Sequence, residues 1–151
     1  MQTVKILNLT KSFGKIRAVD SLSLDIEKGK ITGLIGADGS GKTTLIRLIT
    51  GLLIPDSGEI TVLGLNPAAQ KEELSTKIGY MPQKFGLYED LSIEENLQLY
   101  ADLKKLPYEF DELLEFTKLM PFKTRLAGAL SGGMKQKLGL ACALMGSPDF
   151  L

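Results

Sequence analysis

The sequence contains no histidine, and this absence excludes several kinds of functional site. Without an imidazole, the 151 residues cannot form a Ser-His-Asp triad, a histidine proton shuttle or a histidine-ligated metal centre. Cysteine is almost as scarce, because Cys142 stands alone and cannot close a disulfide within the chain. The cysteine content therefore gives no indication of an oxidising compartment.

An excess of charge and long apolar runs are also missing. The 18 lysines and arginines balance 18 aspartates and glutamates, which argues against a nucleic-acid partner bound through bulk charge and against a polybasic membrane surface. The longest stretch without a polar side chain, residues 138–146, has nine residues, whereas a membrane-spanning helix needs about 20. The first residues lack a basic segment followed by an apolar one, so we expect no targeting segment there.

Glycine, in contrast, is in surplus. It supplies 16 of the 151 residues, about 11%, where proteins average about 7%. Five of these glycines fall in two short clusters, and such clusters are expected where a backbone must turn sharply or approach a ligand closely. The clusters are Gly36, Gly39 and Gly41 in the first, and Gly132 and Gly133 in the second.

The hydrophobic pattern predicts an α/β fold with a helical insertion. The short apolar run 31–35 is typical of a strand buried on both faces. In the second half, Ser92 and Glu95 fit a capping box that begins a helix. We expect strands near residues 4–9, 22–26, 31–35, 59–63 and 78–81, and helices near residues 45–49, 93–100, 111–119 and 133–145.

The first glycine cluster lies in a phosphate loop, residues 36–43, which matches the pattern G-x-x-x-x-G-K-[ST] at every fixed position. Glycines let the backbone N–H groups wrap a phosphate, and the helix that follows directs its positive end at the same anion. Lys42 would reach the β- and γ-phosphates, and the Thr43 hydroxyl would ligate Mg²⁺. The predicted nucleotide-binding residues are Gly36, Ala37, Asp38, Gly39, Ser40, Gly41, Lys42, Thr43 and Thr44.

The second glycine cluster lies in residues 130–136, Leu-Ser-Gly-Gly-Met-Lys-Gln, at the start of a predicted helix. The Ser131 hydroxyl and the amides of Gly132 and Gly133 would form a second anion site at a positive helix end. The same residues also fit an ordinary N-cap without a ligand. From these residues alone, both interpretations stay open.

Taken with the phosphate loop, residues 130–136 make the chain resemble the ATP-binding domain of ABC transporters over essentially its whole length. The segment 130–136 is similar to the family signature, and Gln83, in Gly-Tyr-Met-Pro-Gln, is similar to the family's Q-loop glutamine. Phe13 stands where the family places an aromatic residue. The three elements follow the family's order, with 23 positions from Phe13 to Gly36, 41 from Lys42 to Gln83 and 48 from Gln83 to Ser131.

The resemblance implies a role for each of these residues. Phe13 would stack on the adenine of ATP, and Gln83 would contact Mg²⁺ and the attacking water. The candidate catalytic residues are Lys42 and Gln83, and the candidate metal ligands are Thr43 and Gln83. The signature residues Ser131, Gly132 and Gly133 would bind the γ-phosphate of ATP held by a second ATP-binding domain. Met134 departs from the family pattern, because many members carry glutamine there, and one polar contact to the nucleotide is then missing.

Within the family, residues 79–92 are close to bacterial ABC-2-type exporters, in particular to multidrug exporters. The resemblance implies ATP and Mg²⁺ as cofactors, an ABC-2-type membrane permease as partner, no nucleic acid, and a cytoplasmic position at the inner face of the plasma membrane. Residues 85–88 would face the permease, although a locally packed loop explains them equally well.

The family pattern next expects an apolar strand ending in Asp-Glu and, later, a histidine. The sequence reaches Leu151 where that strand would begin, and Asp149 precedes the apolar residues instead of following them. We therefore expect an incomplete domain, with residues 1–83 and 147–151 in the core and 84–146 in the helical part, and negligible ATP hydrolysis by these residues alone. The alternatives are a non-transport ABC protein of translation or DNA repair, and a non-catalytic nucleotide-binding fragment.

Overall fold

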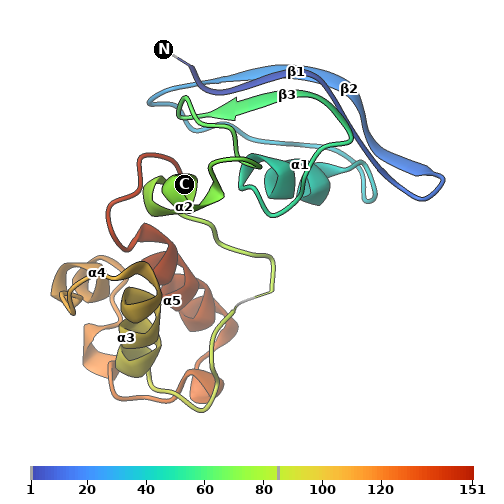
Figure 1. The fold of residues 1–151 in the computed structure, drawn as a ribbon. Coiled ribbons are helices and arrows are strands. Elements are labelled where there is room, and N and C mark those ends of the chain that lie inside the picture. Colours follow the sequence, from blue (N-terminus) through green and yellow to red (C-terminus); the bar gives the residue numbers. More distant parts are fainter. Residues whose placement is uncertain (1, 85) are drawn as a thin grey trace. The chain divides into compact units, whose positions relative to one another are not determined.

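The computed structural model describes residues 2–84 and 86–151 (Figure 1). The chain divides into two compact units. The first unit extends to Ser75 and includes Phe150, and the second extends from Thr76 to Asp149 and includes Leu151.

The first unit is built on an antiparallel sheet of three strands in the order β2-β1-β3. The strands are β1 (Gln2–Phe13), β2 (Ile16–Glu27) and β3 (Ser57–Val62). Apolar residues on one face of β1 and β3 are fully or almost fully buried, as the alternating pattern predicts. They are Val4, Ile6, Leu9, Ile60 and Val62.

Helix α1 (Lys42–Ile49) lies against one face of this sheet (Figure 1). It buries Leu45, Leu48 and Ile49, which recur at helical spacing and confirm the predicted helix. A short helix that the pattern did not predict, α2 (Lys71–Lys77), buries Leu74. Its seven residues are mostly charged or polar, so they carry little periodic signal.

The prediction of a strand at residues 31–35 is wrong. Residues 30–37 form neither helix nor strand, and Ile31 and Ile35 are almost completely exposed. A strand that is apolar on both faces is stable only between neighbouring strands, and no described strand pairs with this segment. The strand expected at 78–81 does not form either, although Ile78 is buried.

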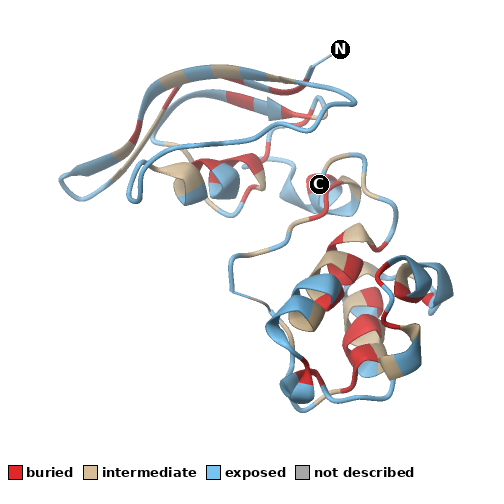
Figure 2. Cartoon of the chain, turned by 180° about the vertical axis from the view of Figure 1, so that it is seen from behind, coloured by how far each residue is buried: buried red, intermediate tan, exposed pale blue. Residues whose placement is uncertain are grey.

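The second unit is helical, as expected. Helices α3 (Ile93–Lys104), α4 (Asp111–Phe116) and α5 (Gly132–Leu144) are joined by 3₁₀ turns at η1 (Met120–Phe122) and η2 (Ala127–Ala129). Buried residues gather on the inner faces of α3 and α5 (Figure 2). Its core consists of Ile93, Leu97, Ala101, Phe110, Leu114, Leu119, Ala127, Leu130, Leu138, Ala141, Cys142 and Met145.

The capping box at the start of α3 is confirmed. The Ser92 hydroxyl accepts from the Glu95 amide at 3.2 Å, and the Glu95 carboxylate accepts from the Ser92 amide at 2.7 Å. Helix α4 ends three residues earlier than predicted, and Lys118 takes a positive φ of 57° shortly after it. None of the helices in the described residues is both long and apolar enough to cross a membrane.

Cys142 is buried within the second unit. Burial in these apolar surroundings raises the pKa of its thiol to about 12. Because the thiolate is the reactive form, the thiol is inert at neutral pH. Cys142 therefore acts as a small core residue and not as a nucleophile.

Candidate functional site

The phosphate loop, residues 36–43, lies at the N-terminal end of α1 in the first unit. Two of its glycines have a positive φ, 80° at Gly39 and 87° at Gly41, a conformation that favours glycine. Gly41 is also the N-cap of α1, and a Cβ there would collide with the carbonyl oxygen of Ala18 on β2. The sequence therefore needs glycine at position 41 on two independent grounds.

The side chain of Lys42 lies across this loop. Its Nζ donates to the carbonyl oxygens of Gly36 and Ala37, each at 2.7 Å, and lies 3.5 Å from the Ser40 hydroxyl oxygen. These hydrogen bonds hold the ammonium group against the backbone of the loop. Phosphate oxygens in the same loop would offer this group charge-assisted hydrogen bonds, which are stronger than those to neutral carbonyls.

The start of α1 supplies donors for an anion. The first helical bond runs from the Leu45 amide to the Gly41 carbonyl at 2.8 Å, so the amides of residues 42–44 have no partner within the helix. No side chain caps Gly41, and no acidic residue occupies the first turn. These amides and the helix dipole therefore favour a phosphate at this end.

The loop fits a nucleoside triphosphate with Mg²⁺. Thr43 is exposed in the first turn of α1, where its hydroxyl can ligate a metal bound to phosphate oxygens. The described residues hold no cluster of three or more His, Cys, Asp or Glu side chains that could bind a metal by themselves. Magnesium takes most of its ligands from phosphates and water, so a single hydroxyl such as that of Thr43 fits this ion.

Phe13 lies in the same unit, at the end of β1. It pairs with Ile16 across the hairpin and is 49% exposed, so a flat ligand could reach the ring. The Lys11 ammonium lies 5.8 Å from the ring centroid and forms an ion pair with Asp56 at 2.7 Å. The hydrogen bonds from Lys11 and the Ser12 amide lower the pKa of the Asp56 carboxyl.

The other predicted site residues lie in the second unit. Gln83 is exposed in a bend without regular structure. Ser131 is the N-cap of α5, and its hydroxyl oxygen accepts from the Met134 amide at 3.3 Å, so the N-cap interpretation holds for this residue. Gly132 and Gly133 are exposed, with open space where a Cβ would stand. The structure therefore places Phe13 and the phosphate loop in one unit, and Gln83 and the signature in the other.

The predicted permease-facing segment, residues 85–88, is only partly described, because Phe85 lies outside the described residues. Tyr88 is 57% exposed, whereas Leu87 packs against the helical core. The segment therefore combines an exposed aromatic ring with a residue that anchors it.

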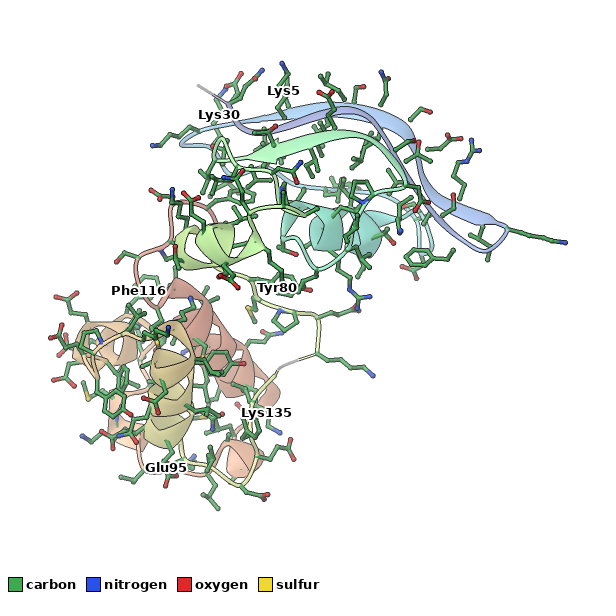
Figure 3. All side chains as sticks on the ribbon, viewed as in Figure 1. Lys5, Lys30, Tyr80, Glu95, Phe116 and Lys135 are labelled. Carbon is green, nitrogen blue, oxygen red and sulfur yellow. The ribbon has the colours of Figure 1, made fainter. Side chains whose placement is uncertain are left out.

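Two contacts beside these residues were missed by sequence reasoning. Asn96 is fully buried and hydrogen-bonds the backbone of residues 88–92. Lys135, labelled near the N-terminal end of α5 in Figure 3, forms an ion pair with Glu89 at 2.7 Å. Glu89 and Lys135 are 46 residues apart, so no local pattern reveals the pair.

Comparison with known proteins identifies a family for this geometry. The family described as ABC transporter matches residues 19–151. The "Probable multidrug ABC transporter ATP-binding protein YbhF" of Escherichia coli (strain K12) is 58% identical over 139 residues, which are 89% of this chain and 24% of that protein. The "Bacitracin transport ATP-binding protein BcrA" of Bacillus licheniformis is 38% identical and is matched over 98% of this chain and 49% of its own length. The chain thus spans less than half of either curated relative.

Solved structures agree with this family. A structure described as an ATP-binding subunit of an ABC transporter superposes with a TM-score of 0.85 at 28% identity, over 97% of this chain and 63% of that one. A nucleotide-free ATP-binding cassette superposes with a TM-score of 0.79 at 30% identity, over 98% of this chain and 66% of that one. These matches confirm the predicted fold class and the resemblance to exporter ATPases of the YbhF type. The chain belongs to the ABC transporter family and shares the fold of its ATP-binding cassettes.

Proposed function

We propose that the chain binds ATP and acts as the energy-coupling part of an ABC exporter. The observation that carries the proposal is the phosphate loop at the start of α1, where the Lys42 ammonium lies across the loop and the amides of residues 42–44 have no partner within the helix. The family to which the chain belongs hydrolyses ATP. The names of the relatives, which include a multidrug transporter and a bacitracin transporter, favour export over the translation or DNA-repair alternative.

In this proposal each residue has a separate task. Lys42 exchanges its carbonyl partners for the β- and γ-phosphates, and Phe13 stacks on the adenine ring. Thr43 would ligate Mg²⁺, which would neutralise charge on the phosphates. For Gln83, a metal-binding role is implied by the family resemblance alone. Gln83 would also orient the attacking water, and Ser131 with its two glycines would contact the γ-phosphate of ATP on a second ATP-binding domain.

The proposed roles of these residues imply two protein partners. A second ATP-binding domain is needed because the signature acts on ATP bound by the opposite phosphate loop. An ABC-2-type permease would receive the energy, with the chain held at the cytoplasmic face of the membrane. The equal numbers of basic and acidic residues, 18 of each, give no electrostatic support for a nucleic-acid partner.

Replacing Ser131 with arginine tests the signature's role. The full-length Ser131→Arg protein should bind ATP as a monomer with wild-type affinity, because the phosphate loop belongs to the other unit. ATP-driven pairing should be lost, since a bulky cation would replace the small hydroxyl at the start of α5. Light scattering with and without ATP measures pairing, and Ser75→Arg places the same charge on an exposed serine elsewhere as a control.

Two results would contradict the assignment of separate roles to the signature and the phosphate loop. If Ser131→Arg and Lys42→Ala abolished monomer binding equally, the signature and the phosphate loop would not be separate. Normal pairing by Ser131→Arg would likewise remove the signature from the interface.

A polypeptide of residues 1–151 alone should hydrolyse ATP negligibly. The family pattern expects an Asp-Glu pair after the signature helix and, later, a histidine. This polypeptide contains no histidine, and its only carboxylate side chain after α5 is that of Asp149. A missing general base costs about 10²–10⁴ in rate. Phosphate release measured with Mg²⁺ and ATP checks this, and hydrolysis that depends on Mg²⁺ and is abolished by Lys42→Ala would contradict it.

A further inference from the structure

Residues 88–92, which follow Gln83, form hydrogen bonds to one buried side chain, that of Asn96. The Asn96 carboxamide oxygen accepts from the Tyr88 amide at 2.9 Å. Its Nδ2 donates to the backbone oxygens of Tyr88, Leu91 and Ser92 at 3.0, 3.2 and 2.9 Å. Because Asn96 is fully buried on α3, residues 88–92 cannot change shape without leaving a buried amide unpaired.

The same loop is joined to the segment that precedes the signature. The Ala127 amide donates to the Leu91 carbonyl at 2.8 Å, and the Gly128 amide donates to the Glu89 carbonyl at 2.9 Å. A Cβ at Gly128 would lie 3.1 Å from that carbonyl oxygen, so glycine permits the close approach. Residues 88–92 and 126–128 therefore form one hydrogen-bonded element.

A side-chain contact extends this element to the signature helix. The Glu89 carboxylate pairs with the Lys135 ammonium at 2.7 Å, and the Lys135 amide closes the first turn of α5 on the Ser131 carbonyl at 2.9 Å. The hydrogen bond from Lys135 lowers the pKa of the Glu89 carboxyl, so this carboxyl is ionised at neutral pH. Lys135 is the more enclosed partner, with 22% of its side chain exposed against 68% for Glu89.

We propose that Glu89 and Lys135 are positioning residues, which fix the first turn of α5 relative to the loop 88–92 so that Ser131, Gly132 and Gly133 meet the nucleotide in one orientation. This inference rests on the proposed function, because it needs the signature to act on ATP. An exposed ion pair contributes little to global stability, so its removal should alter the signature's orientation more than the fold.

Steady-state ATP hydrolysis by the full-length protein tests this role through Glu89→Gln. We expect kcat to fall about three- to tenfold, because small misplacements of groups at a reacting centre are costly. Binding of a fluorescent ATP analogue to the monomer should not change, since the phosphate loop is untouched. Lys135→Gln should likewise lower kcat without changing ATP binding. Lys135→Arg, which can still pair with Glu89, should retain wild-type kcat.

Glu89→Gln also separates positioning from direct attraction between Lys135 and phosphate. The variant leaves the Lys135 charge in place and frees it from its carboxylate, so direct attraction predicts unchanged or faster hydrolysis. Glu94→Gln is the matched control, because it breaks the Lys123–Glu94 pair at 3.6 Å in the same unit, a pair that includes no residue of α5. Its kcat should equal that of the wild type, and thermal unfolding of each variant checks the fold.

The outcomes are distinguishable. A wild-type protein that neither binds nor hydrolyses ATP would overturn the proposed function together with this inference. Wild-type hydrolysis with an undiminished kcat in Glu89→Gln would overturn the positioning role alone. An equal loss in Glu94→Gln would also overturn it, because the effect would then belong to surface charge in general.

Discussion

Lys42→Ala is expected to weaken ATP binding by about 10- to 100-fold, because one hydrogen bond to a charged group contributes about 1.5–3 kcal/mol and each 1.4 kcal/mol is a factor of ten. The Lys42 ammonium already lies inside the phosphate loop, bonded to the carbonyls of Gly36 and Ala37 at 2.7 Å. The substitution removes the only side-chain cation that the structure places within that loop among the described residues. The fold should tolerate the change, because both of these hydrogen bonds are exposed to solvent.

Isothermal titration of the full-length protein with ATP and Mg²⁺ measures this loss. Lys28→Ala is the control, because it removes the same charge from an exposed turn in the same unit. An affinity within twofold of the wild type in Lys42→Ala would show that the loop does not hold the phosphates. An equal loss in both variants would assign the effect to net charge.

Gly41→Ala is expected to damage both the fold of the first unit and its ATP binding. A φ of 87° costs a residue with a Cβ about 1–2 kcal/mol. The added Cβ would also meet the Ala18 carbonyl oxygen, so α1 and β2 would have to separate. Because the α1 amides would move with the helix, we expect a lower free energy of unfolding and no measurable ATP binding.

Gly39→Ala is the matched control for this substitution. Gly39 has a similar φ of 80°, but no atom lies within 4 Å of an added Cβ. Denaturant unfolding of the two variants should therefore show a larger loss for Gly41→Ala, and the difference measures the steric clash. Equal losses would mean that the contact between position 41 and Ala18 imposes no constraint.

The sequence predicts most of what local chemistry determines. The capping box at Ser92 and the helix that contains residues 45–49 form as expected, and Ser131 takes the N-cap role that is one of its two interpretations. Each of these features depends on residues within one or two turns. The phosphate loop is found for the same reason, since its fixed glycines and lysine encode a backbone shape directly.

The sequence does not predict what depends on distant partners. The apolar run 31–35 has the composition of a buried strand, yet a strand requires neighbours and no described strand pairs with it. The Glu89–Lys135 pair and the buried Asn96 depend on how loop, helix and signature meet in three dimensions. The periodicity of a sequence carries no information about such contacts.

Competition between ATP and adenosine for the full-length protein tests the central claim most directly. If the amides at the start of α1 and Lys42 hold the phosphates, ATP with Mg²⁺ should bind at least about tenfold more tightly than adenosine, since the charge-assisted bonds are made only to phosphate. Equal affinity for ATP and adenosine, or no binding of ATP by the wild-type protein, would contradict the account.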